Sequence, residues 1–400
     1  MTDLVVLVGG VRAGLLSRNN EGSAFELDEE YVALADRPVL GQIFEDNPNQ
    51  PHRTRQGIPS WFANLLPEGP LRHLIAERAG VHERRSFFLL GLLGDDLPGA
   101  VVVHPSADVG SNDEELQTHT IDANAELRFS LAGVQLKFSA LRSDRGLTIP
   151  TQGRGGNWIV KLPDQRYDGV PENEHSMLEL ARRSGIAVPT ARLVEVADIE
   201  GLPDNVLTSD RRALAVERFD RGADGSRVHI EDFAQVLGLP PSEKYGATNY
   251  DTIARVLAAL CTEEDLDEFI RRLVFMVGIG NSDAHAKNWS LIYPDGRTAR
   301  LAPAYDLVAV SLYEKIDPRL KARLALKLAD KDTAEAITEA AFRRLAQRAH
   351  LDEERTITVV RTQVTAMQSA WAALRETPDT LDRQLSELLD ERFANLPLFR

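Results

Sequence analysis

The chain has 400 residues, of which 43% are hydrophobic and 27% are charged, as in an ordinary folded protein with a sizeable core. Its formal net charge of −15 argues against a general nucleic-acid binder, because phosphate backbones attract basic surfaces. Cys261 is the one cysteine, which excludes internal disulfides and suits a reducing cytoplasm. No apolar run reaches the length of a membrane span, and the first residues lack the basic region of a signal peptide. We therefore expect a cytoplasmic protein with no membrane partner.

The first hundred residues predict short strands mixed with helices. Apolar runs at residues 4–8 and 101–103 predict strands, and helical patterns at residues 60–66 and 71–79 lie between them. Residues 104–126 are rich in small and acidic side chains, which is typical of a linker or a long loop.

The rest of the chain changes from strands to helices. Residues 127–219 predict a β-rich segment that one helix, after Pro171, interrupts. From about residue 232 to the end, helical periodicity dominates, and it is clearest at residues 333–349 and 352–375. We therefore divide the chain into parts at residues 1–105, 106–225 and 226–400.

The motif that indicates chemistry is the octet Asn281–Asn288, with the sequence NSDAHAKN. The apolar run before it predicts a buried helix that ends at Gly280, so the octet is a loop leaving a rigid element. Asp283, an asparagine five residues later at Asn288, and a further carboxylate at Asp306 form the pattern of kinase-type phosphotransferases. In that chemistry Asp283 orients or deprotonates the attacking hydroxyl. The Asn288 amide oxygen and the Asp306 carboxylate hold Mg²⁺ on the nucleotide.

A predicted hairpin brings these residues together. Residues 289–293 and 299–302 flank a Pro-Asp-Gly turn. With Asp295 and Gly296 at the turn centre, Asn288 lies opposite Pro303, so Asp306 is roughly 10 Å away. Two alternatives remain: a merely solvated polar loop, or a hydrolase or transition-metal site that uses His285. The second needs more His or Cys ligands than nine scattered histidines and one cysteine provide.

Two charged side chains predict a nucleotide pocket in the β-rich segment. Lys161 ends an apolar strand, from which a lysine reaches a phosphate or a carboxylate unless its ammonium simply extends to water. Glu174 shares the apolar face of the helix after Pro171 with residues 177, 178 and 181, and a buried acid needs a partner. Lys161 and Glu174 would then form the Lys–Glu pair that positions phosphates. Glu172 or Glu179 would serve instead if the helix were rotated.

Two further segments complete the pocket. Residues 129–139 predict a phosphate loop, because Gly133 lets backbone amides approach anionic oxygens and Lys137 adds charge. Residues 153–156 are richer in glycine but are more typical of a flexible turn. The strand at residues 214–220 leaves the β-rich part next to the helical part, where its backbone can hydrogen-bond an adenine edge.

Taken together, these blocks resemble the HipA family of serine/threonine kinases, which are toxins of bacterial type II toxin–antitoxin pairs. The likeness extends over nearly the whole chain. It is carried, in order, by residues 62–69, 92–100, 130–137, 216–221, 229–240, 244–246, 281–288 and 305–306. The resemblance implies an α+β, two-lobed, protein-kinase-like fold of the HipA type. Its amino-terminal lobe would be mixed α/β and its carboxy-terminal lobe all-helical.

The resemblance also implies roles for individual residues. Asp283 would be the catalytic base, and Asn288 and Asp306 the Mg²⁺ ligands. ATP contacts are implied for Ala132, Gly133, Val134, Gln135, Leu136, Lys137, Lys161, Glu217, Arg218, Phe219, His285, Ala286, Lys287, Asn288, Tyr305 and Asp306. Leu136 stands where family members often carry an acid. Ser130 would be the autophosphorylated serine, whose new negative charge ejects the phosphate loop and inactivates the enzyme.

Partners follow from the same resemblance. It implies a small helix-turn-helix antitoxin, contact with operator DNA only through that antitoxin, and a protein substrate from translation such as an aminoacyl-tRNA synthetase. Two other functions fit the residues: a small-molecule phosphotransferase, and a nucleotide-binding co-repressor without turnover.

Overall fold

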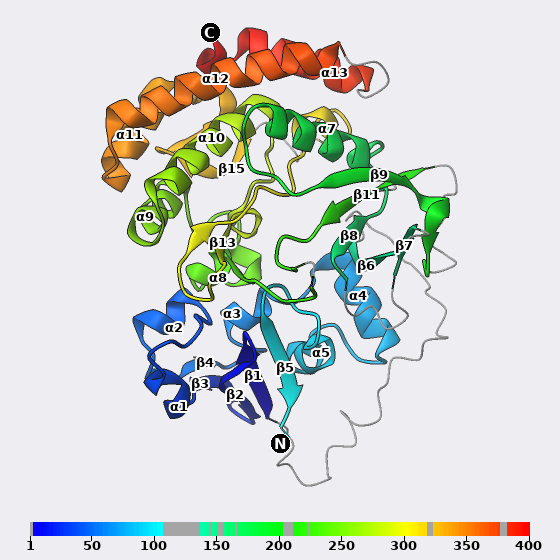
Figure 1. The fold of residues 1–400 in the computed structure, drawn as a ribbon, viewed down its shortest axis with the longest axis vertical. Helices are drawn as coiled ribbons and strands as arrows, with labels where there is room; N and C mark the ends of the chain where they lie inside the picture. Colours follow the sequence, from blue (N-terminus) through cyan, green and yellow to red (C-terminus); the bar gives the residue numbers. More distant parts are fainter. Residues whose placement is uncertain are drawn as a thin grey trace. The chain divides into compact units, whose positions relative to one another are not determined.

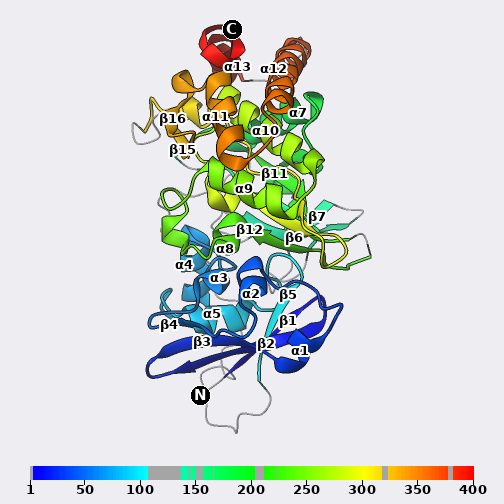
Figure 2. The same cartoon turned by 90° about the vertical axis from the view of Figure 1, so that its left-hand side faces the viewer.

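The computed structural model describes residues 3–106, 137–143, 146–149, 156–164, 166–202, 211–222, 224–317, 323–376 and 382–400 (Figures 1 and 2). The chain forms two compact units, each built from three segments. Unit 1 contains residues 1–162, 194–241 and 292–297, and unit 2 contains residues 163–193, 242–291 and 298–400. No helix within the described ranges combines the length and the apolar character that crossing a bilayer requires.

The amino-terminal part of unit 1 is a five-stranded antiparallel sheet with the order β4-β3-β2-β1-β5. Its strands are β1 (Leu4–Val8), β2 (Val11–Asn19), β3 (Gly22–Leu27), β4 (His52–Thr54) and β5 (Val101–Pro105). Residues alternate between buried and half-buried along β1, because successive side chains point to opposite faces of a sheet. The strand predicted at residues 4–8 is confirmed, and the one predicted at 101–103 extends by two residues.

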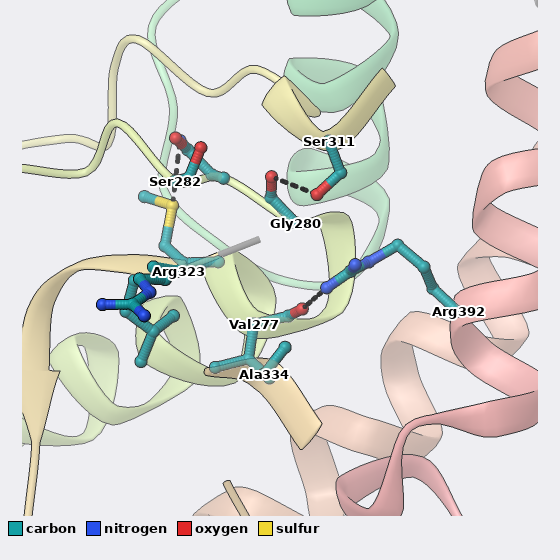
Figure 3. A pocket seen from close by; sticks show the side chains of 10 residues that line it. Val277, Gly280, Ser282, Ser311, Arg323, Ala334 and Arg392 are labelled. Carbon is teal, nitrogen blue, oxygen red and sulfur yellow. Dashed lines mark hydrogen bonds between the residues drawn. The ribbon is translucent and has the colours of Figure 1, made fainter. Parts of the chain in front are cut away.

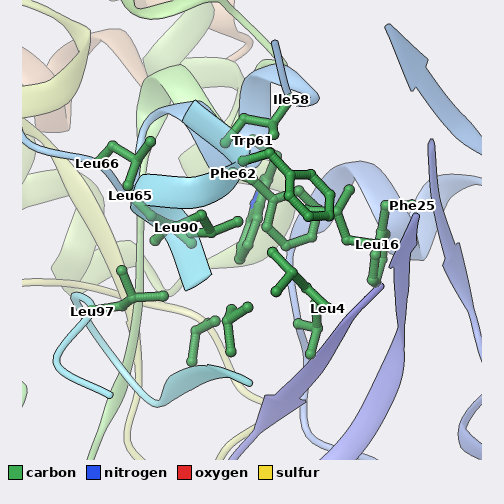
Figure 4. Close-up of a cluster of buried hydrophobic side chains, with 14 of the residues drawn as sticks. Leu4, Leu16, Phe25, Ile58, Trp61, Phe62, Leu65, Leu66, Leu90 and Leu97 are labelled. Atoms are coloured by element: carbon green, nitrogen blue, oxygen red, sulfur yellow. The ribbon is translucent and has the colours of Figure 1, made fainter. Parts of the chain in front are cut away.

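Helices cover the buried face of this sheet and supply its core (Figure 4). They are α1 (Glu29–Ala33), α2 (Gln42–Asp46), α3 (Ser60–Ala63), α4 (Gly69–Arg78) and α5 (Ser86–Leu93). Phe62 of α3 meets Phe25 of β3 edge-to-face with ring centroids 4.8 Å apart, an arrangement that aromatic pairs prefer. The helix predicted at residues 71–79 is confirmed as α4, whereas the pattern at 60–66 forms only one turn.

A second sheet has the order β10-β7-β6-β8-β11-β9. Its strands are β6 (Lys137–Ser143), β7 (Gly146–Thr148), β8 (Trp158–Lys161), β9 (Ala191–Glu195), β10 (Ile199–Glu200) and β11 (Arg212–Glu217). β8 lies between β6 and β11, antiparallel to both, and Trp158 and Val160 are buried in a small core of their own. This sheet confirms the β-rich character predicted after residue 127 for the residues that the structure describes.

Two polar clusters are buried in unit 1. In the first, Asp220 accepts hydrogen bonds from Arg218 and Arg221 and from the amide of Gly99, and Asp96 pairs with both arginines. Burial opposes the charge on Asp220, but the Arg218 hydrogen bonds and the two guanidinium charges hold its pKa below the usual value.

The second cluster surrounds Glu231 of β12 (His229–Asp232), which is fully buried. Its carboxyl group accepts from Trp61 Nε1 at 2.7 Å, the Tyr293 hydroxyl at 3.1 Å and the Gln42 amide at 3.1 Å. Burial nevertheless raises the pKa of Glu231 to about 8, since its three donors are neutral groups. Next to it in the sequence, one-turn helix α8 (Phe233–Val236) begins with a capping box formed by Asp232 and Gln235.

Unit 2 is mainly helical, with α10 packed against α9, α12 and α13, and α12 also against α7 and α11. The helices are α7 (Val170–Arg183), α9 (Tyr250–Leu260), α10 (Glu263–Ile279), α11 (Glu339–Ala349), α12 (Glu353–Arg375) and α13 (Arg383–Asn395). The helix predicted at residues 352–375 is confirmed within one residue. The one predicted from residue 333 begins six residues later, because residue 333 ends a strand and residues 334–336 form a 3₁₀ turn.

The prediction of an all-helical carboxy-terminal part is wrong in one respect. It contains β13 (Ser290–Tyr293) and β14 (Arg300–Leu301), and the hairpin of β15 (Arg323–Leu328) with β16 (Lys331–Thr333). β13 and β14 belong to a three-stranded sheet with the order β12-β13-β14. The hairpin around residues 295–296 was itself predicted and is present, with Gly296 at φ +79° in the turn.

Candidate active site

Helix α10 carries the predicted catalytic loop. Its first turn is fixed by a capping box between Thr262 and Asp265, and its last turns are buried on almost every side. Gly280 ends the helix at φ +71°, a conformation that favours glycine. A Cβ at this position would come within 2.3 Å of the Ser311 hydroxyl, so the close packing also requires glycine. The prediction of a buried helix ending at Gly280 is confirmed.

Arg392 of α13 reaches from the right of Figure 3 to the end of α10. Its guanidinium donates to the carbonyls of Val277 at 2.6 Å and Gly278 at 2.8 Å, which are among the last carbonyls of the helix. A cation at a helix carboxy-terminus is favourable because the exposed carbonyls carry negative partial charge. The cavity beside Arg392 measures about 10 Å³, room for roughly one water molecule, so it is no substrate pocket.

The side chain of Asn281 joins the two halves of the predicted site. Its Oδ1 accepts from the amide of Asp283 at 2.9 Å, and its Nδ2 donates to the carbonyl of Asp306 at 3.3 Å. Asn281 is 1% exposed, so its carboxamide has few alternative partners. A single side chain therefore fixes the backbone of the predicted base relative to that of a predicted metal ligand. Asn281 is the first residue of the predicted octet, but no role was predicted for it.

Asp283 lies at the surface with its backbone held on one side and its carboxylate contacted on the other. Its carbonyl accepts from the His285 amide at 2.7 Å and from Asn288 Nδ2 at 2.9 Å. Its Oδ1 accepts from the Tyr245 hydroxyl at 2.5 Å. The carboxylate is thus oriented by a neutral donor and remains accessible, as a general base must be.

The residues predicted to bind Mg²⁺ offer a suitable set of donors. Because Asn288 uses its Nδ2 for Asp283, its Oδ1 is the atom left for a cation, and Asp306 contributes a carboxylate. Magnesium prefers such hard oxygens and takes few of them from the protein. In the described part of the chain, no three His, Cys, Asp or Glu side chains gather into a site for another metal. Asp306 adopts φ +54°, an uncommon conformation that Asn281 helps to hold through its hydrogen bond.

Neighbouring predicted residues brace the same loop. The Tyr305 hydroxyl bonds to the Lys287 carbonyl at 2.9 Å and to Ser290 Oγ at 2.5 Å. The Ala286 amide donates to the carbonyl of Lys244 at 3.1 Å. The structure thus brings residues 283–288, Tyr305 and Asp306 into one network within unit 2. The contacts of Tyr305 and Lys287 shown here are structural, and their contact with ATP stays a prediction.

His285 is 6% exposed and meets the Tyr245 ring edge-to-face, with centroids 4.8 Å apart. Burial lowers the pKa of His285 to about 4, so the ring is neutral near pH 7. Among the described residues its Nδ1 has no hydrogen-bond partner. A neutral, buried imidazole does not supply the positive charge that a phosphate contact would use. It can only donate or accept a hydrogen bond.

The hairpin register differs slightly from the prediction. The Ala302 amide donates to the Ser290 carbonyl at 2.9 Å, which pairs these two residues. In that register Asn288 lies opposite Ala304 rather than Pro303, one residue from the predicted pairing. The turn is therefore one residue longer than the predicted two-residue turn of Asp295 and Gly296.

The residues predicted for nucleotide phosphates are described only in part. Lys161 is 4% exposed on β8, directly opposite Lys137 on β6. Glu174 is 2% exposed on the buried face of α7, as the helical periodicity predicted. Glu179, an alternative to Glu174, bonds instead to Arg182 and Arg183. Because Lys161 belongs to unit 1 and Glu174 to unit 2, their pairing stays a prediction.

The predicted adenine contact lies where β11 ends. The Arg218 amide continues the ladder by donating to the Asn157 carbonyl at 2.8 Å, and its side chain is committed to the Asp220 cluster. A nucleotide contact by Arg218 would therefore use its backbone groups, and contacts by Glu217 and Phe219 stay predictions. Ser130 and residues 132–136 lie outside the described residues.

The chain is similar in fold to a protein of known structure. The chain matches a solved structure from Shewanella oneidensis MR-1, described as its toxin–antitoxin system HipA, HipB and operator DNA complex. The TM-score is 0.71 at 23% identity over 98% of this chain and 96% of that one. This likeness shows the fold, so the predicted α+β class of the HipA type is confirmed.

The family is shown by sequence. Residues 4–104 match the model of the HipA N-terminal domain, and residues 129–371 match that of the HipA-like C-terminal domain. A protein of Sinorhizobium fredii named "Putative kinase Y4dM" is 43% identical over 100% of this chain and 98% of its own length. The serine/threonine-protein kinase toxin HipA of S. oneidensis is 28% identical over 67% of this chain and 66% of its own length. The chain belongs to the HipA family.

Proposed function

We propose that this protein is an ATP-dependent serine/threonine protein kinase and the toxin of a type II toxin–antitoxin pair. The observation that carries the proposal is the network around Asn281, which ties Asp283, Asn288 and Asp306 into one arrangement within unit 2. Membership of the HipA family and a 43% identical relative named as a kinase support it.

Each residue has a defined part in this reaction. The Asp283 carboxylate accepts the proton of the attacking hydroxyl, and its surface position leaves room for a protein side chain. Asn288 Oδ1 and the Asp306 carboxylate would hold Mg²⁺, which when bound neutralises the charge on the nucleotide phosphates. Asn281 ties the backbone of Asp283 to that of Asp306, and positioning is the main contribution a protein makes to phosphoryl transfer.

Regulation and partners belong to the same proposal. Ser130 would be the autophosphorylated residue, the phosphate loop at residues 132–137 would hold ATP, and Lys161 with Glu174 would position its phosphates. The fold shared with a chain of the HipA, HipB and operator DNA complex favours a HipB-like antitoxin as partner. A net charge of −15 favours DNA contact through that antitoxin rather than directly. The substrate would be a translation protein such as an aminoacyl-tRNA synthetase.

Transfer of labelled γ-phosphate tests the proposal. Incubating the full chain with labelled ATP and Mg²⁺ should label the protein itself, and Asp283→Asn should reduce the initial rate by about 10²–10⁴-fold. Asp36→Asn is the matched control, because it makes the same change at a fully exposed side chain of unit 1. Unchanged labelling in Asp283→Asn would refute the assignment of the base. Mapping the phosphate to a residue other than Ser130 would remove the regulatory claim alone.

A further inference from the structure

The strongest contact to the predicted base comes from a residue to which the proposed reaction assigns no part. The Tyr245 hydroxyl lies 2.5 Å from Oδ1 of Asp283, the separation typical of a hydroxyl that donates to an ionised carboxylate. A general base makes a contact of the same kind with the hydroxyl that it deprotonates. The phenol therefore presents to Asp283 the chemical group that an acceptor substrate would present.

The surroundings of Tyr245 show how this contact can be released. Its side chain is 47% exposed, and its ring packs edge-to-face on His285. The backbone beside it is fixed separately, because the Lys244 carbonyl accepts from the Ala286 amide at 3.1 Å. A half-exposed ring on an anchored backbone can rotate away without disturbing the loop that carries Asp283. Rotation would also remove the ring contact with His285.

We propose that the Tyr245 hydroxyl occupies the acceptor position on Asp283, and that a substrate hydroxyl must displace it before transfer. This inference rests on the proposed kinase function and adds a contact that lowers the turnover rate of the enzyme when no protein substrate is bound. It also limits the acceptor to a hydroxyl on an exposed, flexible side chain that can reach past the ring. A hydrogen bond to a charged group changes an equilibrium constant roughly 10- to 100-fold. The effect of the Tyr245 contact on the reaction rate is therefore large enough to measure.

ATP hydrolysis, in which water is the acceptor, measures the effect without an identified protein substrate. In that step the water oxygen attacks the γ-phosphorus of ATP, and the bond from that phosphorus to the bridging oxygen of ADP breaks. Asp283 takes one proton from the water and releases it to solvent, so the products are ADP and inorganic phosphate. Tyr245 competes with the water for Oδ1 of Asp283.

The test is the initial rate of ATP hydrolysis by the full chain with Mg²⁺. Tyr245→Phe keeps the ring and removes the hydroxyl, so it should raise the turnover rate about 5- to 10-fold at an unchanged KM for ATP. The control is Tyr167→Phe, because the Tyr167 hydroxyl also bonds a carboxylate of unit 2, that of Asp317 at 2.9 Å, and not that of Asp283. That variant should hydrolyse ATP at the wild-type rate.

The outcomes separate this inference from the proposed function. A lower turnover rate in Tyr245→Phe would mean that the phenol holds the base in place, and it would overturn displacement. An unchanged rate, with Asp283→Asn inactive, would overturn displacement and leave the kinase proposal standing. If the wild-type chain neither hydrolyses ATP nor transfers phosphate, both proposals fail together.

Discussion

The buried cluster around Asp220 in unit 1 and the loop around Asp283 in unit 2 use carboxylates in opposite ways. Asp220 is 5% exposed and is bonded by two guanidinium groups and a backbone amide. Asp283 is exposed, and its carboxylate accepts a hydrogen bond from a neutral phenol, that of Tyr245. A carboxylate neutralised by cations holds a fold together but is a poor base. One oriented by neutral groups keeps the capacity to accept a proton.

The largest expected effect comes from removing the charge of Asp220. Asp220→Asn leaves Arg218 and Arg221 to share the Asp96 carboxylate in a buried site, so the free energy of unfolding should fall by about 3–5 kcal/mol. Urea unfolding of the variant measures this, with Asp36→Asn expected to unfold like the wild type. A loss below about 1 kcal/mol would mean that this cluster is no more structural than a surface ion pair.

A second change tests whether the loop network serves activity rather than stability. Asn281→Ala removes the link between the backbones of Asp283 and Asp306, and should lower the rate of phosphate transfer about 100-fold, because misplacement by about 1 Å has that effect. The matched control is Asn64→Ala in unit 1, another buried asparagine, which donates to the carbonyls of Ser60 and Leu239.

Both asparagine variants should lose about 1–3 kcal/mol of stability, since each removes two hydrogen bonds to partly buried backbone groups. Only Asn281→Ala should lose activity when rates are compared at equal folded fraction. Equal activity losses in the two variants would show that Asn281 acts through stability alone.

The features of the candidate site that local sequence patterns encode could be predicted from the sequence. The octet, the helix before it and the turn at Gly280 were predicted, because local periodicity and a glycine at a helix end fix them. The hairpin was predicted within one residue of register for the same reason. Asp283, Asn288 and Asp306 were selected from their spacing, and their roles stay predictions.

The contacts that organise the site were not predictable in this way. Tyr245 is 38 residues from Asp283 in the sequence, and Arg392 is 114 residues from the carbonyl of Gly278. No local pattern encodes such pairings, although the Lys-Tyr-Gly block was a signal for Tyr245. Helix α11 begins six residues later than predicted, because residue 333 ends a β-hairpin, which depends on pairing with another segment, and residues 334–336 form a 3₁₀ turn.

A third prediction concerns pH and the second buried cluster of unit 1. The pKa of Glu231 is raised to about 8 in the folded protein, against 4.5 as its ordinary value. Between these values the folded protein keeps a proton that the unfolded chain has released, so stability falls as pH rises. The slope is about 1.4 kcal/mol per pH unit, or about 2 kcal/mol between pH 6.5 and 8.

Glu231→Gln should flatten this slope. Glutamine keeps an acceptor for Trp61 Nε1, and its amide can donate to the Tyr293 hydroxyl. Urea unfolding at pH 6.5, 7.25 and 8 measures the difference between variant and wild type. The window avoids the buried His229, whose pKa is lowered to about 4 and whose effect on stability is lost as pH falls below about 6.5. Parallel pH profiles would refute a protonated Glu231.

The smallest expected effect distinguishes backbone strain from steric crowding at Gly280, where the catalytic loop begins. Gly280 and Gly296 both have positive φ, at +71° and +79°, so alanine at either position should cost about 1–2 kcal/mol of stability. At Gly280 the added Cβ would also meet the Ser311 hydroxyl and Arg392, whereas at Gly296 its nearest contact is Pro38 at 3.5 Å.

Gly280→Ala should therefore lose about 1 kcal/mol more than Gly296→Ala in urea unfolding, since its neighbours have to move. It should also lower the rate of phosphate transfer, because Ser311 and Arg392 contact the turn that leads into Asn281 and Asp283. Gly296→Ala, on a turn of unit 1, should keep the wild-type rate. If the two variants matched in both measurements, the packing around Gly280 would have no part in holding the loop.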